Sequence, residues 1–252
     1  MSRKRRILIT AAVLVVVIPL SALLAFVVWA SSALPAMPEA LAAMESDAAV
    51  TVTENDWITF SPNDVNPDTG LIFYPGARVD PRAYAVPARA LAEAGYYVVI
   101  VPMPLNMAIF GSDRAADVIA ANPQISSWAL GGHSMGGAFA ASFVDTHPGA
   151  VDGLVFWAAY PPDFNDLTDQ PDLHVASIYG TLDGLATVDK VLAGKPLLPP
   201  SATFVPIEGG NHAQFGSYGD QSGDNPATIS REEQQAQVVA ATAALLEAID
   251  AP

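Results

Sequence analysis

The sequence lacks cysteine altogether, and this absence excludes disulfide scaffolds, thiolate zinc sites and cysteine nucleophiles. Basic residues are scarce too: the chain has 11 lysines and arginines against 26 aspartates and glutamates, for a net charge of −15. Four of the cations lie at residues 3–6, so the rest of the chain is acidic enough to repel nucleic acids. Charged residues make up only 15% of the 252 residues and hydrophobic residues 51%, which excludes disorder as the main state.

An uncharged apolar stretch, residues 7–30, follows the basic cluster directly. A helix of this length crosses the roughly 30 Å hydrocarbon layer of a membrane. Trp29 lies where an interfacial aromatic residue is expected, and membrane helices tolerate a proline such as Pro19. We therefore expect residues 1–30 to be a cytoplasmic basic tip and a transmembrane signal anchor. The remainder would then be extracytoplasmic, held at the cell membrane by this single helix.

A cleaved signal peptide is the alternative, because small residues at 30–33 could form a cleavage site and release a secreted protein. The apolar stretch is longer than the core of about 7–15 residues in a usual cleaved signal, which favours the uncleaved anchor. Residues 31–55, with their alanines, serines and prolines, are expected to be a linker. Residues 56–252 are expected to form the folded domain.

From residue 57 onwards, short apolar segments alternate with helix-like segments. Several are apolar along their whole length, such as YYVVIVP at residues 96–102, as in strands buried on both faces of a parallel sheet. Ser230 and Glu233 have the spacing of a capping box at the start of the clearest helix. The alternation predicts one α/β domain with a doubly wound, mostly parallel sheet. The expected strands are residues 57–60, 70–74, 96–102, 127–131, 153–159, 173–179 and 203–207, and the expected helices are residues 81–94, 114–121, 135–146 and 230–249.

The most informative motif is Gly132-His133-Ser134-Met135-Gly136, between an apolar strand and a helix of small residues. This is the G-x-S-x-G pattern of a nucleophile elbow, in the strand–turn–helix context that the motif requires. The turn is so sharp that the positions two before and two after the serine must lack bulky side chains, and both are glycine. Such a turn lifts the Ser134 hydroxyl to the carboxyl end of the sheet. It also points the Met135 amide, an oxyanion donor at a helix N-terminus, toward the same place.

With this motif in this setting, the sequence resembles the α/β-hydrolase family of serine hydrolases, from about residue 57 to the C-terminal helix. It looks most like the small lidless group related to dienelactone hydrolases. That enzyme uses a cysteine nucleophile, whereas this chain has Ser134 and no cysteine, so dienelactone hydrolysis is not implied. No spacing of histidines and carboxylates suggests a catalytic metal, no Walker-type loop is present, and no cofactor is expected.

A serine hydroxyl is a weak nucleophile that needs a neighbouring base, and the chain offers four histidines. His133 is adjacent to the nucleophile, so its side chain should diverge and serve as a wall of the site or in packing. His147 lies at an expected helix end, where it suits a cap, and His174 begins a strand at the wrong end of the sheet. His212 lies in a Gly-rich loop after the last strand, which reaches the carboxyl edge. We therefore predict His212 as the base.

The resemblance implies the chain order Ser, then Asp or Glu, then His, so a carboxylate should precede His212. Asp183 comes straight after a strand and forms, with Gly180, the G-x-x-D pattern that the family commonly has at this place. Asp189 is the nearest competitor, but it is expected in the following helix. The aspartates within residues 163–172 suit turns in a Pro-rich loop. Asp183 is therefore the predicted third member of the triad.

A second oxyanion donor is expected in the loop after the strand at residues 70–74. The family usually has His-Gly there, whereas this chain has Pro75 and Gly76. Two candidates stay open, the backbone amides of Ala77 and Arg78, with Ala77 preferred. Gly76 and Arg78 are also expected to contact substrate. The Arg78 side chain would hold a substrate carboxylate or a nearby aspartate, or would pair with Asp80 at the surface.

The connection between residues 159 and 173 is short, so a lid is small or absent and the cleft is open. The pattern predicts a membrane-anchored, extracytoplasmic serine hydrolase that cleaves small carboxylic esters through an acyl-enzyme, with short or medium acyl groups preferred. An acyltransferase or peptidase with the same triad is an alternative, and so is a non-catalytic module that binds an envelope component. The expected apolar walls of the cleft include Met103 and Phe215 at the substrate, and also Met107, Phe110, Pro161, Pro162 and Phe164.

Overall fold

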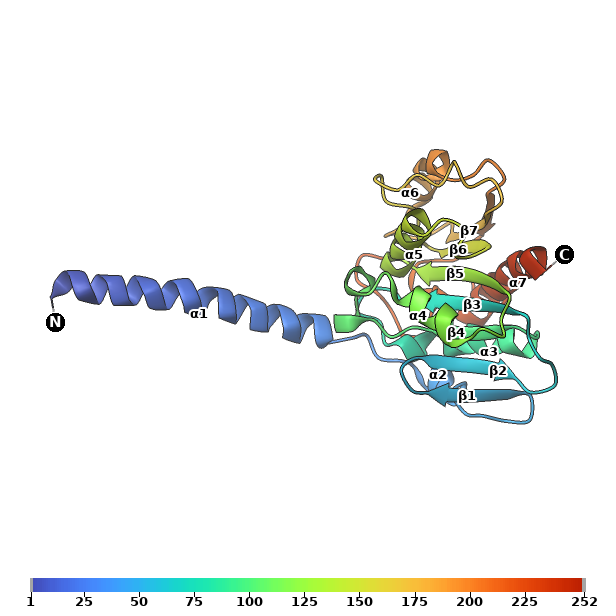
Figure 1. The fold of residues 1–252 in the computed structure, drawn as a ribbon, viewed down its shortest axis with the longest axis horizontal. Coiled ribbons are helices and arrows are strands. Elements are labelled where there is room, and N and C mark those ends of the chain that lie inside the picture. Colours follow the sequence, from blue (N-terminus) through green and yellow to red (C-terminus); the bar gives the residue numbers. More distant parts are fainter. Residues whose placement is uncertain (1, 251–252) are drawn as a thin grey trace.

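An eight-stranded sheet organises the fold in the computed structural model, which describes residues 2–250 (Figure 1). The strand order is β1-β2-β4-β3-β5-β6-β7-β8. The first two strands are antiparallel to their neighbours, and the other six run parallel to one another. The expected doubly wound, mostly parallel sheet is confirmed. The strands are β1 (Val50–Glu54), β2 (Ile58–Pro62), β3 (Thr69–Tyr74), β4 (Tyr97–Ile100), β5 (Ser127–His133), β6 (Gly153–Trp157), β7 (His174–Gly180) and β8 (Thr203–Ile207).

Helices cover both faces of the sheet, because the parallel strands are apolar on both sides. Side chains alternate between faces along β3: Leu71 and Phe73 join one buried cluster, whereas Ile72 and Tyr74 join the other. The first cluster includes residues of α3 and α7, and the second includes residues of α4 and α5. The helices of the domain are α2 (Pro38–Ala42), α3 (Ala85–Glu93), α4 (Arg114–Ala121), α5 (Met135–Thr146), α6 (Val188–Ala193) and α7 (Arg231–Asp250).

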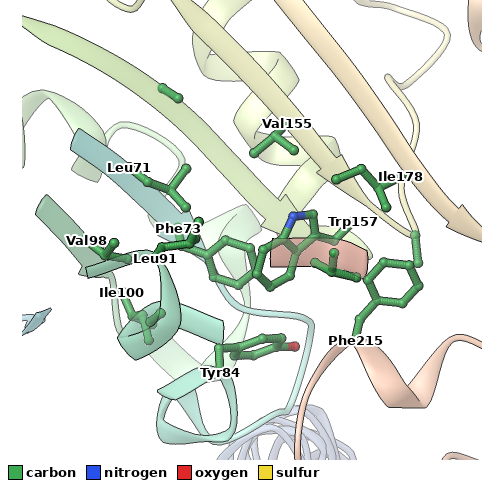
Figure 2. Packing of buried hydrophobic residues seen from close by; sticks show 14 of the residues in the cluster. Leu71, Phe73, Tyr84, Leu91, Val98, Ile100, Val155, Trp157, Ile178 and Phe215 are labelled. Atoms are coloured by element: carbon green, nitrogen blue, oxygen red, sulfur yellow. The ribbon is translucent and has the colours of Figure 1, made fainter. Parts of the chain in front are cut away.

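The first cluster centres on Trp157 at the end of β6, as Figure 2 shows. Its ring centroid lies 4.4 Å from that of Phe73. The indole nitrogen of Trp157 donates a 3.0 Å hydrogen bond to the hydroxyl of Thr242 on α7. This bond explains the buried threonine among the apolar side chains of α7, since a buried indole N–H needs an acceptor.

The helix starts follow from local sequence. Ser230 and Glu233 form the expected capping box before α7: the Ser230 amide donates to the Glu233 carboxylate at 2.8 Å, and the Glu233 amide donates to the Ser230 hydroxyl at 3.1 Å. The helix expected over residues 81–94 is divided instead into a 3₁₀ turn, η1 (Pro81–Tyr84), and α3. Pro87 explains the division, because a proline without an N–H is accommodated in the first turn of a helix but not in its interior.

The N-terminal helix α1 (Arg3–Ser31) projects away from the domain (Figure 1). Its segment Val13–Ser31 is long and apolar enough to cross a membrane, with a mean hydropathy of 2.8, and a signal sequence passes the same test.

The segment expected to be a linker, residues 31–55, instead contains α2 and β1, and Ala40 and Val50 are buried. β1 forms because its valines alternate with threonines, a pattern that pairs with β2 at the edge of the sheet.

Candidate active site

Ser134 lies in the sharp turn between β5 and α5, with φ +53° and ψ −122°. A non-glycine residue at positive φ is strained, and such strain gathers at functional sites. A side chain at Gly132 would collide with the backbone of Gly136, and one at Gly136 would collide with the carbonyl of Tyr74. The Ser134 amide donates to the carbonyl of Trp157 at 3.0 Å, which ties the turn to β6. The glycines of the motif therefore permit the elbow for the reason expected from sequence.

His212 and Asp183 form a buried pair at the ends of two neighbouring strands, β8 and β7. Their side chains are 1% and 0% exposed, and Nδ1 of His212 lies 2.8 Å from Oδ2 of Asp183. The other carboxylate oxygen accepts 2.7 Å hydrogen bonds from the amides of Leu185 and Ala186. A carboxylate partner makes Nδ1 the protonated ring nitrogen, so the Nε2 atom carries the free lone pair.

A cavity of about 370 Å³ brings the predicted nucleophile and base together. Ser134 and His212 both line it, as does Met135 at the start of α5. Within residues 2–250, Nε2 of His212 has no hydrogen-bond partner. Apart from Ser134 and His212 the lining is mainly apolar: Met135, Ala138, Phe139, Ala158, Ala159, Tyr160, Pro162, Leu185 and Ala186. This cavity can hold an apolar acyl group against a serine hydroxyl and a free imidazole nitrogen.

The loop after β3 presents one free amide beside the elbow. The Gly76 amide donates to the Tyr84 hydroxyl at 3.0 Å, and the Arg78 amide donates to the Asn106 carbonyl at 2.7 Å. Among the described residues, the amides of Ala77 and Met135 have no protein acceptor. Of the two donors left open by the sequence, Ala77 is therefore the one that is free. Met135 is the first residue of α5, where amides lack partners within the helix.

Tyr84 and His133 pack beside the loop after β3 and beside His212. The Tyr84 hydroxyl, which accepts from Gly76, lies 2.8 Å from Nδ1 of His133. The His133 ring is 4.5 Å from the His212 ring, centroid to centroid. Burial lowers the pKa of His133 well below its ordinary value of 6.5, and the nearby charge of a protonated His212 lowers this pKa further. His133 is thus an uncharged wall behind His212, the predicted base, and a wall of the site is one of the two roles that the sequence left open for it.

Two polar residues of this network are missed by sequence reasoning. Tyr84 lies in the 3₁₀ turn η1, and Asn106 lies in η2 (Pro104–Asn106); neither belongs to a recognisable motif. The only sequence feature that could indicate Tyr84 and Asn106 is that each follows an expected strand and so lies at the carboxyl edge of the sheet. That signal is too general to select a residue. The fold alone brings them to the Ala77 loop.

Several residues predicted to contact substrate lie outside the cavity lining. Phe215 is fully buried and stacks on His133 at 5.7 Å between ring centroids, and Met103 is 8% exposed within the core. Gly76 is packed between His133 and Tyr84. Of the other expected walls, Pro162 lines the cavity, Pro161 and Met107 are buried, and Phe110 and Phe164 are 49% and 75% exposed.

The Arg78 guanidinium contacts neither an aspartate nor the cavity. It donates hydrogen bonds of 2.9 Å to the carbonyls of Trp29 and Ser32 and lies 4.4 Å above the Trp29 ring. Asp80 pairs instead with Arg82 at 2.6 Å. The expected surface pair of Arg78 and Asp80 is therefore not formed. Within the described part of the chain, no three histidine, aspartate or glutamate side chains gather as a metal site.

Comparison with known proteins agrees with this fold. A protein described as a predicted CIB-like hydrolase from Thermoplasma acidophilum shares 15% identity and a TM-score of 0.55, over 76% of this chain and 97% of its own. The esterase domain of a Rhodothermus marinus protein shares 14% identity and a TM-score of 0.54, over 78% and 97%. MGS-MChE2, an alpha/beta hydrolase enzyme from the metagenome of lagoon sediments at Mar Chica, Morocco, shares 17% identity and a TM-score of 0.53, over 66% and 90%. No curated protein matches the chain in sequence.

These identities are low, so the structural likeness shows the fold alone. The sequence itself matches the family model described as the alpha/beta hydrolase family over residues 70–236. This match spans well over half of the chain and runs from β3 into α7. The protein therefore belongs to the alpha/beta hydrolase family.

Proposed function

We propose that this protein is a membrane-anchored serine hydrolase that cleaves carboxylic esters, with Ser134 as nucleophile, His212 as base and Asp183 as the carboxylate that orients His212. One observation carries the proposal: the strained Ser134 and His212 line the same cavity, and Nδ1 of His212 lies 2.8 Å from the buried Asp183 carboxylate. Family membership supports hydrolysis in general. The residues at the cavity support the ester class and the acyl-enzyme route.

In the first half-reaction, Nε2 of His212 takes the proton from the Ser134 hydroxyl as its oxygen attacks the ester carbonyl. The Asp183 carboxylate stabilises the imidazolium through the bond to Nδ1. The negative charge on the carbonyl oxygen faces the amides of Met135 and Ala77, which have no protein acceptor among the described residues. The ester C–O bond then breaks, His212 gives its proton to the leaving alcohol, and the acyl group stays on Ser134.

In the second half-reaction, His212 takes a proton from water, and the hydroxide attacks the acyl carbon. The bond to Ser134 breaks, and His212 returns the proton to the serine oxygen, so the net change is ester plus water to acid plus alcohol. This route needs a hydrogen bond between Ser134 and His212 that the free structure does not make. Catalytic hydrogen bonds are often long in free enzymes and shorten when substrate binds.

The shape of the site supports small acyl groups and an open entrance. Residues 158–173, which join β6 to β7, contain neither helix nor strand and so build no lid domain. Asn165 in this connection is buried and bonds to Ser142 and Asp145 of α5 at 2.8 and 2.9 Å. The connection is therefore fastened beside the cavity, whose volume of about 370 Å³ suits a short or medium acyl chain.

An extracytoplasmic location is part of the proposal and rests on the cations at residues 3–6, which favour a cytoplasmic N-terminus for α1. The absence of cysteine makes a direct test available. Asp64→Cys introduces one thiol at an exposed turn of the domain. A membrane-impermeant maleimide should label this variant in intact cells. Labelling only after the cells are opened would contradict the proposed side.

The decisive experiment on function is activity-based labelling. A fluorophosphonate probe should label the full-length protein on Ser134, and Ser134→Ala should abolish both labelling and turnover of an activated ester. A protein that is folded but unlabelled would indicate a binding module. Full activity of Ser134→Ala would reject the nucleophile. Added alcohol acceptors separate the remaining classes, because an acyltransferase would pass its acyl group to them in preference to water.

A further inference from the structure

The C-terminal end of α1 is fastened to the loops at the carboxyl edge of the sheet. Arg78, in the loop after β3, donates to the carbonyls of Trp29 and Ser32. The side-chain amide of Asn106, after β4, donates to the carbonyl of Ala30 at 3.1 Å. Figure 1 shows α1 leaving the domain at one end and pointing away from it. The helix therefore has a fixed attachment point on the domain.

This attachment point is the edge that carries the candidate site. Arg78 follows the proposed oxyanion donor Ala77 directly, in a loop that packs against His133 at Gly76. The chain after α1 then runs along the same edge. Leu34 pairs with the backbone beside Val79, and the Met37 amide donates at 2.8 Å to the carbonyl of Ser217 in the loop that follows His212. Both loops of the proposed site thus contact the chain as it leaves α1.

Exposed apolar side chains surround the junction of α1 and the domain. Phe110 of η3 (Ala108–Phe110) meets Phe26 of α1 edge-on at 6.3 Å, and Phe26 lies 6.0 Å from Trp29. We call Phe26, Trp29, Ile109 and Phe110 the apolar collar. Their exposed fractions are 38%, 51%, 52% and 49%. A cluster of exposed apolar side chains on an acidic domain marks a contact with an apolar phase.

The length of the helix places the collar at a membrane boundary. Residues 7–30 would extend about 36 Å as a helix, slightly more than a hydrocarbon layer of about 30 Å. With the basic residues 3–6 held at the cytoplasmic surface, the last turn of the apolar stretch emerges on the opposite side, and Phe26 lies about one turn before its end. Since Phe110 touches Phe26, η3 lies at the surface of the hydrocarbon. η3 also packs against α5, whose Met135 and Phe139 line the cavity.

We propose that the site opens toward the membrane that holds α1, and that the substrate is an acyl ester resident in that membrane. The acyl chain would pass from the bilayer along the collar to the apolar cavity at Ser134. This inference rests on the proposed function and adds its substrate class. A soluble ester can reach the same serine, but it gains nothing from the collar.

Orientation can be tested without catalysis, because the chain has no cysteine to interfere with labelling. Phe110→Cys places a fluorophore in the collar, and Val65→Cys places one on an exposed apolar position before β3, at the opposite edge. With the full chain in vesicles that contain doxyl-labelled phosphatidylcholine, the fluorophore at 110 should be quenched and that at 65 should not. Equal quenching, or none at 110, would overturn the inference. Removal of α1 in the mature protein, seen by N-terminal sequencing, would overturn it too.

The substrate class is tested with the full chain in vesicles and two esters, one long-chain ester in the bilayer and one soluble short-chain nitrophenyl ester. Phe110→Ser should reduce turnover of the bilayer ester roughly tenfold or more, as loss of apolar contact predicts, and leave the soluble ester unchanged. Val65→Ser is the matched control and should change neither. An unchanged ratio of the two activities in Phe110→Ser, with the soluble ester still cleaved, rejects the membrane substrate alone. No cleavage of either ester by the natural sequence rejects the proposed function itself.

Discussion

The two ends of the parallel strands differ in what surrounds their cavities. We call the end that carries the candidate site the carboxyl edge and the opposite end the amino edge. The amino edge has the larger cavity, about 570 Å³, between α7 and the last two strands, and His174 and Asp172 lie exposed at its rim. The carboxyl edge has about 370 Å³, but its His212 and Asp183 are buried and hydrogen-bonded. Volume and the presence of titratable side chains therefore do not identify the site. The proposed site rests instead on a buried, hydrogen-bonded pair beside the strained Ser134.

Backbone strain separates the edges in the same way. Each described non-glycine residue with positive φ lies just beyond the carboxyl end of a strand, from β3 to β6. Such conformations cost about 1–3 kcal/mol each and persist only where the surroundings hold them. The arginine and asparagine among them also hold the end of α1. These residues are Arg78, Leu105, Asn106, Ser134 and Ala158.

The largest expected effect compares the histidines of the two edges. His212→Ala should lower kcat/KM for a soluble ester by about 10⁴-fold or more, because the serine loses its base. His174→Ala changes an exposed side chain at the start of β7 and should leave kcat/KM unchanged. The measurement is steady-state hydrolysis with both proteins at equal folded concentration. Comparable losses in the two variants would remove the distinction between the edges.

The aspartates give the next comparison. Asp183→Asn should lower kcat by about 10³–10⁴-fold, since an amide donor facing Nδ1 would favour the wrong tautomer of His212. Asp172→Asn, beside the larger cavity, should be silent. Steady-state hydrolysis of the same soluble ester measures kcat for both variants. A fully reactive Asp183→Asn variant would show that another group orients His212.

Two buried tyrosines sharpen the comparison within the carboxyl edge of the sheet. Tyr84→Phe removes the acceptor of the Gly76 amide, while Tyr74→Phe removes bonds to the Ser112 carbonyl and the Ala115 amide. Each loss leaves buried polar groups unpaired and should cost about 1–3 kcal/mol of unfolding free energy. Only Tyr84→Phe should also lower kcat, by roughly tenfold with KM unchanged, because it loosens the Ala77 loop. Equal kcat values in the two variants would assign Tyr84 a purely structural role.

The sequence predicts the architecture well, because strands buried on both faces leave continuous apolar segments. Residues 114–121 and 135–146 are predicted with the bounds that α4 and α5 have. The expected linker differs most, since residues 31–55 contain α2, in an alanine-rich segment, and the edge strand β1. Edge strands bury one face only, so β1 has a weaker signal than the central strands.

The candidate site, too, is predictable from sequence in one part and not in another. The elbow depends on neighbours along the chain, so spacing alone predicts its glycines and its strained serine. Tyr84 and the attachment of Arg78 to Trp29 depend on segments about 50 residues apart that meet only in the fold. Arg78 is a scarce cation in the sequence, yet nothing local indicates that its partners are backbone carbonyls of α1. Contacts between distant loops carry no periodic or motif signal.

The smallest expected effect is a pH dependence of stability from His133. Burial lowers its pKa in the folded protein below 6.5, so the unfolded chain binds more protons than the folded one in the interval just below pH 6.5. Stability is therefore fully present above about pH 6.5 and falls as the pH drops toward the folded-state pKa, by up to about 1.4 kcal/mol per pH unit. His133→Gln removes this titration and should flatten the decline.

Urea unfolding of the full chain in detergent at pH 7.5, 6.5 and 5.5 measures the slopes. Equal slopes for His133→Gln and the natural sequence would show that the pKa of His133 is not lowered on folding, so that His133 becomes charged in the folded protein as the pH falls below 6.5. That charge would lie 4.5 Å, ring to ring, from the proposed base and would oppose its protonation. The lowered pKa keeps His133 uncharged beside the proposed base, and among the described residues no buried histidine lies at the amino edge.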